Sequence, residues 1–218
     1  MRRMALLHRA ELHPTKLELL AAWLPGRGWY RAGADADPVR VASFRFDDPD
    51  GVVGVETMLV RAGDGPILQV PLTYRDAPLH DGDGWLIGTA EHSVLGRRWV
   101  YDGTGDAVYA ATLAGAILTG GRQADEYLEV NGRLERREPS MTVTGSGSPA
   151  THVPSIEAIR HVQDEDPTLI VTDSLELTVV RRVDSGNGLS GAASNGAMLS
   201  GTWRGQPTPL PLAYALVR

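Results

Sequence analysis

Four apolar residues near the amino terminus recur at a near-helical spacing: Leu17, Leu19, Leu20 and Trp23. A period close to 3.6 residues places such positions on one face of a helix. Pro14 and Thr15 stand before this stretch and Pro25–Gly26 follows it, and both are typical boundary sequences. The pattern predicts one amphipathic helix here.

Three strand-like apolar runs follow: Val39–Phe46, Val52–Val60 and Ile67–Tyr74. The turn sequences DDPDG and AGDG separate them, because aspartate and glycine tolerate the backbone angles of tight turns. The pattern predicts an antiparallel meander of three strands. The next segment, residues 84–103, mixes apolar and polar residues without a clean period.

A second helix is predicted from the spacing of four apolar residues: Val108, Leu113, Ile117 and Leu118. Asp106 is suited to the N-cap position, and Gly120–Gly121 is suited to end the helix. The order helix, meander, helix indicates a first unit of ordinary domain size.

The remaining sequence predicts five strands: Tyr127–Val130, Met141–Val143, Thr168–Thr172, Leu175–Val183 and Leu212–Val217. The third and fourth are joined across Asp173–Ser174, which predicts a tight hairpin. Residues 184–201 are too rich in glycine to predict a helix. Residues 145–155 form the segment richest in small residues and are predicted to be a joint.

These elements predict an α+β fold with mostly antiparallel β-sheet and a few helices. Residues 1–144 would form a first α+β unit, and residues 151–218 a small β-rich unit. The alternative is that both pack as one continuous domain.

Composition removes several classes of function. The 218 residues include no cysteine, so the chain supplies no disulfide and no thiolate for metal binding or catalysis. The net charge of −6 and the scattered arginines disfavour nucleic-acid binding, which needs clustered cations. The apolar run Met4–Leu7 is too short for a signal peptide or a membrane span, so no membrane association and a cytoplasmic location are expected.

Several segments in this order resemble the actinobacterial maltokinase family, in which an N-terminal cap domain precedes the kinase core. The residues that carry the resemblance are Trp23–Tyr30, Trp99–Asp102, and a hairpin from Leu169–Val171 to Val179–Arg182. The resemblance implies a cap domain followed by the start of a kinase-like N-lobe, without the catalytic lobe. It also implies a link to carbohydrate metabolism.

Compared with the related kinases, this chain lacks residues that phosphate transfer requires. The strand Leu177–Arg182 matches one that carries a phosphate-binding lysine in the related kinases, and the corresponding residue is Thr178. A neutral hydroxyl cannot supply that cation. Lys16 is the only lysine of the chain, and no glutamate lies between Asp184 and Trp203 to pair with one. Kinase activity by this chain alone is therefore not expected.

Other catalytic patterns are weak. Ser190 lies in a sequence that approaches a nucleophile elbow but ends in alanine, and glycine–serine loops are common. The six histidines show no metal-binding spacing. The acidic clusters at residues 47–48, 81–83 and 164–166 suit solvated turns better than a glycosidase pair. We therefore predict no catalytic residue, no metal site and no cofactor.

The segment Glu91–Asp102 is the densest collection of polar, cationic and aromatic side chains. Paired arginines beside aromatic rings suit a phosphate or a sugar. The alternative, which we favour, is that the arginines only pair with the surplus aspartates. The candidate ligand or partner contacts are His92, Arg97, Arg98, Trp99 and Tyr101, together with Arg181 and Arg182 after the apolar run of the 175–183 strand.

Three hypotheses follow. The first is a non-catalytic, maltokinase cap-like protein that acts through a protein partner, such as an enzyme of glucan or trehalose metabolism. The second is a module that binds a small sugar or phosphate ligand. The third is an enzyme of unrelated mechanism, built on the Ser190 loop or on a carboxylate pair.

Overall fold

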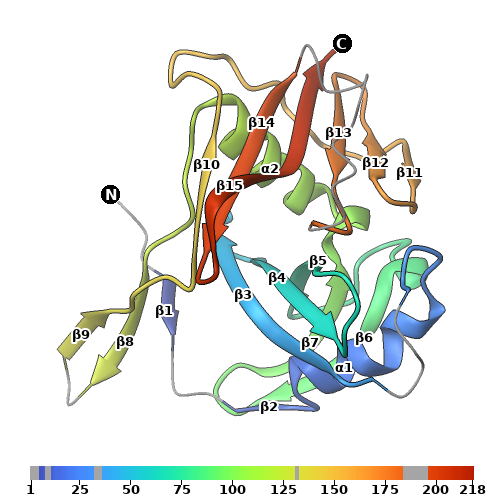
Figure 1. The fold of residues 1–218 in the computed structure, drawn as a ribbon, viewed down its shortest axis with the longest axis vertical. Helices are drawn as coiled ribbons and strands as arrows, with labels where there is room; N and C mark the ends of the chain where they lie inside the picture. Colours follow the sequence, from blue (N-terminus) through green and yellow to red (C-terminus); the bar gives the residue numbers. More distant parts are fainter. Residues whose placement is uncertain (1–4, 8–10, 32–35, 131–132, 184–195) are drawn as a thin grey trace.

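Antiparallel β-sheet dominates the molecule (Figure 1), and the α+β class predicted from the sequence is confirmed. The computed structural model describes residues 5–7, 11–31, 36–130, 133–183 and 196–218. Within these residues the strands form two six-stranded sheets and one three-stranded sheet. No helix in the described part of the chain is long and apolar enough to cross a membrane.

The first sheet contains the predicted meander and extends it. Its strands, in spatial order, are β2 (Leu12–His13), β6 (Leu86–His92), β7 (Gly96–Asp102), β5 (Leu68–Arg75), β4 (Gly54–Ala62) and β3 (Pro38–Phe46). The hairpin β6–β7 occupies the segment whose pattern showed no clean period. A register shift between Leu86 and Gly88 interrupts the alternation of side chains, which explains why no strand was evident there.

The second sheet is built almost entirely from the carboxy-terminal part of the chain. Its strands, in spatial order, are β10 (Met141–Gly145), β14 (Ala197–Trp203), β15 (Gln206–Val217), β13 (Leu175–Val179), β12 (Thr168–Val171) and β11 (His161–Gln163). The predicted hairpin β12–β13 is confirmed.

Strand β15 begins six residues earlier than predicted, in spite of three prolines: Pro207, Pro209 and Pro211. Alternate residues of a strand direct their backbone nitrogens to the same side. Strand β13 pairs only with Ala213–Val217, so the proline-bearing half of β15 has only β14 as its neighbour. The missing N–H groups therefore remove no hydrogen bond from the ladder.

Residues 180–183 leave the second sheet and bond to the first. The Val180 amide donates to the Leu212 carbonyl of β15 at 2.9 Å. The Gln69 amide of β5 donates to the Arg181 carbonyl at 2.7 Å, and the Val183 amide donates to the Ile67 carbonyl at 2.9 Å. Strand β13 therefore ends at Val179, four residues before the predicted end, because the chain crosses from one sheet to the other.

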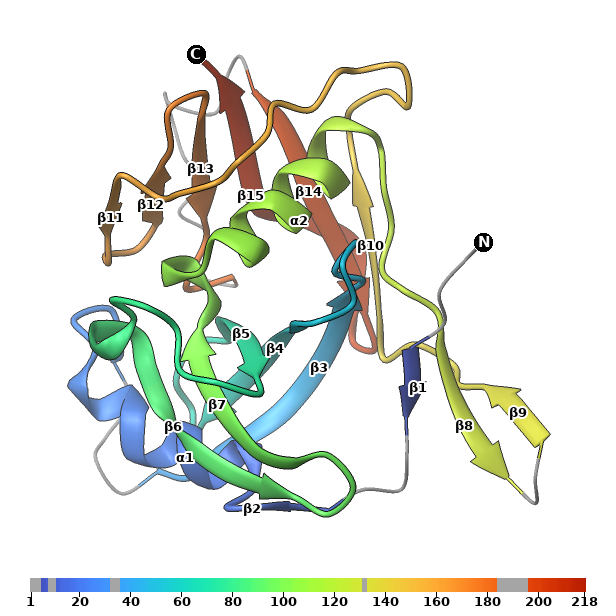
Figure 2. The ribbon, with the colours of Figure 1, turned by 180° about the vertical axis from the view of Figure 1, so that it is seen from behind.

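The third sheet contains β1 (Ala5–Leu7), β8 (Glu126–Val130) and β9 (Arg133–Arg136). Strand β1 is parallel to β8, whereas β8 and β9 form an antiparallel hairpin. This hairpin projects away from both six-stranded sheets (Figures 1 and 2).

Both predicted helices are present with the predicted caps. Helix α1 (Lys16–Trp23) begins with a capping box, in which Thr15 accepts from the Glu18 amide and Glu18 accepts from the Thr15 amide. Asp106 caps α2 (Ala107–Leu118), and Gly120 adopts a φ of 71° just after it. Short 3-10 turns lie at η1 (Leu24–Gly26), η2 (Asp83–Trp85) and η3 (Gly103–Gly105).

Two hydrophobic clusters cover opposite faces of the first sheet. Helix α1 covers one face, through Leu20, Trp23 and their neighbours. The other face shares a larger core with α2 and the second sheet, and α2 lies across that sheet in Figure 2. Residues from both sequence-defined units therefore contribute to one core, while the boundary between residues 144 and 151 stays a prediction.

The chain after β10 passes so close to α2 that only glycine fits. A Cβ atom on Gly145 would lie 2.0 Å from the Ala116 carbonyl oxygen, and one on Gly147 would lie 2.0 Å from the Leu118 carbonyl oxygen. The Gly147 amide donates to the Ile117 carbonyl at 2.9 Å, so the contact also satisfies the end of the helix.

We expect Gly145→Ala to destabilise the protein by several kcal/mol, about 2–4, because backbone atoms on both sides of the contact would have to move. Gly115→Ala is the matched control, since a Cβ there meets nothing within 4 Å and alanine favours a helix interior by about 1 kcal/mol. Chemical denaturation of both variants measures the difference. Equal effects of the two substitutions would contradict the close approach.

Candidate functional site

The sequence-predicted segment Glu91–Asp102 forms most of the β6–β7 hairpin. The strand register places Trp99 opposite Thr89 and Arg75, and it places Tyr101 on the same face, opposite Thr73. Arg98 lies on the other face of β7, which also carries the core residue Val100. Arg97 and Arg98 therefore point to opposite faces and do not form a clamp.

Local partners occupy the polar atoms of this hairpin. Arg97 donates to Glu91 at 2.9 Å, and both side chains are about 60% exposed. Arg98 donates to the Leu95 carbonyl at 2.7 Å, and Nδ1 of His92 accepts from the Val94 and Leu95 amides. The hairpin thus has an ordered turn with an exposed apolar pair, Val94 and Leu95, at its tip.

Tyr101 is buried, in contrast to Arg97 and Trp99 of the same strand. Its ring is 2% exposed, and its hydroxyl accepts from the Leu79 amide at 2.9 Å. Trp99 is only half-buried. Of the five residues predicted in this segment, Arg97 is the most accessible cation, and Tyr101 fixes the loop that precedes η2.

Arg181 is fully buried, although the sequence suggested that it faces a partner. Its side chain has an exposed fraction of 0%. The crossing of residues 180–183 between the sheets turns this side chain into the interior. It is therefore inaccessible to a partner protein and has a different role.

Arg181 is the centre of a buried polar network that we call the Arg181 network. Its members are Arg181, Asp102, Thr104, Asp164, Thr168 and Trp29. The Arg181 guanidinium donates through Nη2 to Asp102 at 2.7 Å and through Nε to Thr168 at 2.7 Å. Asp102 ends β7 in the first sheet, whereas Thr168 begins β12 in the second sheet. One guanidinium therefore bonds directly to both sheets.

Trp29 contacts both Arg181 and Asp164 of the network. The Arg181 guanidinium carbon lies 4.6 Å from the centroid of the Trp29 ring, a cation–π distance. The indole nitrogen of Trp29 donates to Asp164 at 2.8 Å. The Nη1 atom of Arg181 has no hydrogen-bond partner among the described residues, so the contact with the ring is part of what compensates its burial.

Arg182 lies at the edge of the same region. Its Nε donates to Asp166 at 2.5 Å, and the other oxygen of Asp166 accepts from the amides of Arg181 and Arg182. The Arg182 side chain is 25% exposed. Asp166 therefore fixes the backbone at the crossing between the sheets.

The acidic clusters at residues 47–48 and 164–166 are not merely solvated turns. Asp48 is 9% exposed and accepts from the amides of residues 50, 52 and 53, which closes the β3–β4 turn. Asp164 and Asp166 bond to Arg181 and Arg182, as described above. The cluster at residues 81–83 fits the expectation better, because Asp81 and Asp83 are both exposed.

A second charged cluster lies where α1 meets the first sheet. The amine of Lys16 donates to Glu56 at 2.5 Å, and the hydroxyl of Tyr74 donates to the same oxygen at 3.0 Å. The Glu56 side chain is 5% exposed, and that of Lys16 is 34% exposed. The only lysine of the chain is thus paired with a buried carboxylate. It lies far in sequence from β13, where the resemblance would place a phosphate-binding lysine.

Electrostatics in this cluster favour the charged carboxylate. Burial alone would raise the pKa of Glu56, but the nearby charges of Lys16 and Arg45 and the two hydrogen bonds lower it below its usual value. Burial and the Glu56 charge raise the pKa of Tyr74 well above its usual value, so its hydroxyl stays a hydrogen-bond donor. The cluster is consequently a stable ion pair with a neutral phenol beside it.

Thr178, which stands where the resemblance expects a lysine, lies on the less buried face of β13. It pairs with Leu169 of β12 and Tyr214 of β15, whereas Leu175, Leu177 and Val179 face the core. Its immediate strand neighbours thus supply no cation. The role of β13 is to form part of the second sheet and its core.

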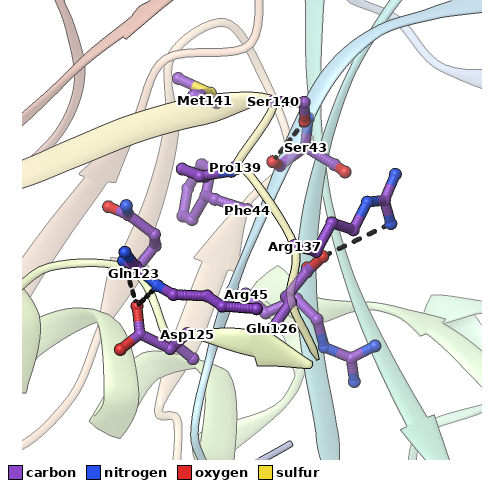
Figure 3. Close-up of a pocket in the computed structure, with 12 residues that line it drawn as sticks. Ser43, Phe44, Arg45, Gln123, Asp125, Glu126, Arg137, Pro139, Ser140 and Met141 are labelled. Atoms are coloured by element: carbon purple, nitrogen blue, oxygen red, sulfur yellow. Dashed lines mark hydrogen bonds and ion pairs between the residues drawn. The ribbon is translucent and has the colours of Figure 1, made fainter. Parts of the chain in front are cut away.

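The pocket drawn in Figure 3 lies between β3 and the chain on either side of the β8–β9 hairpin. Arg45, Arg136 and Arg137 line it, together with acidic and hydroxyl side chains. Arg136 donates to Asp125 at 2.6 Å, and Arg137 lies 3.5 Å from Glu126. This pocket contains no member of the Arg181 network and none of the residues predicted from the sequence.

No group of three or more histidine, aspartate or glutamate side chains in the described residues is arranged to hold a metal ion. Ser190, which the sequence offered as a possible nucleophile, lies outside the described residues.

Sequence reasoning missed the residues that organise the interior. Asp102, Thr104 and Thr168 have no exposed surface, and Glu56 has 4%. Local sequence does not indicate their burial, because each bonds to a residue far away along the chain. The one available signal was that Lys16 is the only lysine of the chain.

Together, the fold and these clusters define an α+β module in which the most buried charged groups bond to one another. Comparison with protein families then identifies part of it: residues 23–106 match the family model of the maltokinase N-terminal cap domain. This match spans the region from the end of α1 to the N-cap of α2, including β3 to β7. No curated protein matches the chain.

The cap-like resemblance predicted from Trp23–Tyr30 and Trp99–Asp102 is therefore confirmed, since both segments lie inside the matched range. Residues 23–106 are therefore similar to the maltokinase N-terminal cap domain.

We expect Arg181→Met to destabilise the protein by about 3–5 kcal/mol, because it leaves the carboxylate of Asp102 buried without its partner. The control is Arg160→Met, which breaks an ion pair with Asp173 whose side chains are 63% and 71% exposed. Such an exposed pair contributes little, because water screens the two charges. Urea denaturation of both variants gives the comparison, and a loss for Arg181→Met no larger than the control would refute the role of the network.

The lowered pKa of Glu56 predicts a pH dependence of stability. A carboxylate with a lowered folded pKa stabilises the native state above its unfolded pKa of about 4.3, and this contribution is lost as the pH falls through the folded value. Glu56→Gln should therefore lower stability at neutral pH and flatten its fall below about pH 5. Glu91→Gln, on an exposed pair, should change neither. Unfolding measured from pH 3 to pH 7 tests this, and parallel curves for Glu56→Gln and the unsubstituted protein would count against it.

Proposed function

We propose that this chain is a non-catalytic, cytoplasmic, maltokinase cap-like protein that acts by binding a protein partner. The partner class is an enzyme of glucan or trehalose metabolism. The cap-domain match supports this link, because the matching family is named for the maltokinase.

The Arg181 network is the observation that carries the non-catalytic assignment. Its charged side chains bond to one another across the two sheets, and the pocket of Figure 3 lies elsewhere. Catalytic acids and bases must instead reach a substrate within hydrogen-bond distance. The role of these residues is to hold the module in one shape, which suits a protein that presents a surface.

The tip of the β6–β7 hairpin is the surface that we assign to the partner. Val94 and Leu95 are 56% and 54% exposed, and Arg97 lies beside them with 62% of its side chain exposed. Arg97 and Glu91 form a surface pair that is worth little to the fold, so a partner carboxylate can compete for the guanidinium. The matching partner surface is an apolar depression with an acidic rim.

The test uses the purified chain alone and with candidate enzymes of glucan and trehalose metabolism from the same genome. With maltose and ATP, the chain alone should form no sugar phosphate. Titration calorimetry should detect a stoichiometric complex with one of the enzymes. Leu95→Asp combined with Arg97→Glu should weaken this complex by at least about tenfold, because both the apolar and the charged contact are lost.

Arg160→Glu is the matched control, because this exposed arginine lies outside the hairpin and should leave the complex unchanged. Phosphorylation of maltose by the chain alone, or the absence of any complex, would refute the proposal. A rise in Tm with maltose, trehalose or their phosphates would instead support a small-ligand module. Loss of this rise in Arg97→Ala would place the ligand in the Glu91–Asp102 segment, as the second hypothesis expects, and loss in Arg137→Ala would place it in the pocket of Figure 3.

A further inference from the structure

Strand β9 has an uncovered edge in the structure. Among the described strands it is hydrogen-bonded only to β8, and the hairpin projects from the molecule (Figures 1 and 2). An uncovered edge offers unpaired N–H and C=O groups to another strand.

The other long strand edges are partly covered or lack donors, since the open half of β15 carries Pro207, Pro209 and Pro211. Along β3, the Ser140 hydroxyl bonds to both the amide and the carbonyl of Ser43, and the Ala124 amide donates to Arg45. Along β10, the Gln123 side chain accepts from the Val143 amide. The remaining outer strands, β1, β2 and β11, have only two or three residues each.

Strand β9 presents one apolar and three charged side chains. All four are exposed, Leu134 by 47%. Arg136 is held by Asp125. The strand carries a positive charge, Arg133, and a negative charge, Glu135, on either side of an exposed leucine.

This order is self-complementary in one antiparallel register. If two copies of β9 pair with Leu134 opposite Leu134, then Arg133 of each copy lies opposite Glu135 of the other. Directly opposite residues share one face, so a twofold pair must be centred on a residue. Centring it on Arg133, Glu135 or Arg136 places that charged residue opposite its own copy. Like charges directly opposite each other destabilise a strand pair, so the leucine-centred register is the favourable one.

We propose that the partner for this edge is a second copy of the same chain, paired through β9 about a twofold axis at Leu134. The two hairpins then form one continuous sheet across the dimer. Leu134 contacts its symmetry mate on one face of that sheet, and the two Arg133–Glu135 pairs lie on the other face. Only four residues of each copy form this contact, so the dimer is weak and forms reversibly at high protein concentration.

Charge reversal tests the register. Arg133→Glu alone places two carboxylates opposite each other at both symmetry-related positions, and Glu135→Arg alone does the same with two guanidinium groups. Each should weaken dimerisation by about tenfold, as two cross-strand pairs change from attraction to repulsion. The double variant Arg133→Glu/Glu135→Arg restores both pairs and should dimerise as the unsubstituted protein does. Sedimentation velocity over a wide concentration range measures the dissociation constants.

The absence of cysteine from the chain allows a direct test of proximity. In Leu134→Cys, two thiols should meet at the twofold axis, so a short thiol-to-thiol cross-linker should yield a covalent dimer. Val94→Cys is the matched control, because it is also an exposed turn-proximal apolar residue but lies on the β6–β7 hairpin. It should yield no dimer at the same concentration.

A monomer at every concentration, or equal cross-linking of both cysteine variants, would overturn the proposal. So would a double variant that stays as weak as the single variants. These experiments use the purified chain by itself and, apart from the control Val94→Cys, substitute only residues of β9. Their outcome is therefore independent of whether the β6–β7 hairpin binds a metabolic enzyme.

Discussion

The buried guanidinium of Arg181 is the interaction on which the rest of the structure depends. It donates to Asp102 in one sheet and to Thr168 in the other, and it stacks on Trp29. A buried charge is costly unless it is paired and hydrogen-bonded, so these groups can be buried only together. The network thereby fixes how the two sheets are oriented, a specificity that apolar packing alone provides less strictly.

The Arg181 network joins two parts of the chain that lie far apart in the sequence. Trp29 and Asp102 lie within the cap-like segment, residues 23–106, whereas Asp164, Thr168 and Arg181 come from the part of the chain beyond it. The cap-like segment therefore depends on contacts with residues that lie outside it in the sequence. The outward surfaces, such as the β6–β7 and β8–β9 hairpins, are left to make contacts with other molecules.

Local sequence determined much of the fold but little of the interior. The capping box at Thr15, the N-cap Asp106 and the apolar runs of β3, β4 and β5 were readable because each depends on neighbours within a few residues. The β6–β7 hairpin was missed because a register shift breaks its alternation. Arg181 was assigned to the surface because its burial follows from a crossing between sheets, and its contact with Asp102 joins residues 79 positions apart. No local pattern encodes such a contact.

Residues 180–183 have a consequence for how the molecule comes apart. This short segment supplies hydrogen bonds to Leu212 on one side and to Gln69 and Ile67 on the other, so it is shared by two sheets. Neither sheet can open here without breaking part of the other, and the larger core belongs to both. The two halves of the chain are therefore mechanically coupled, and the molecule should lose its structure in one cooperative transition instead of sheet by sheet.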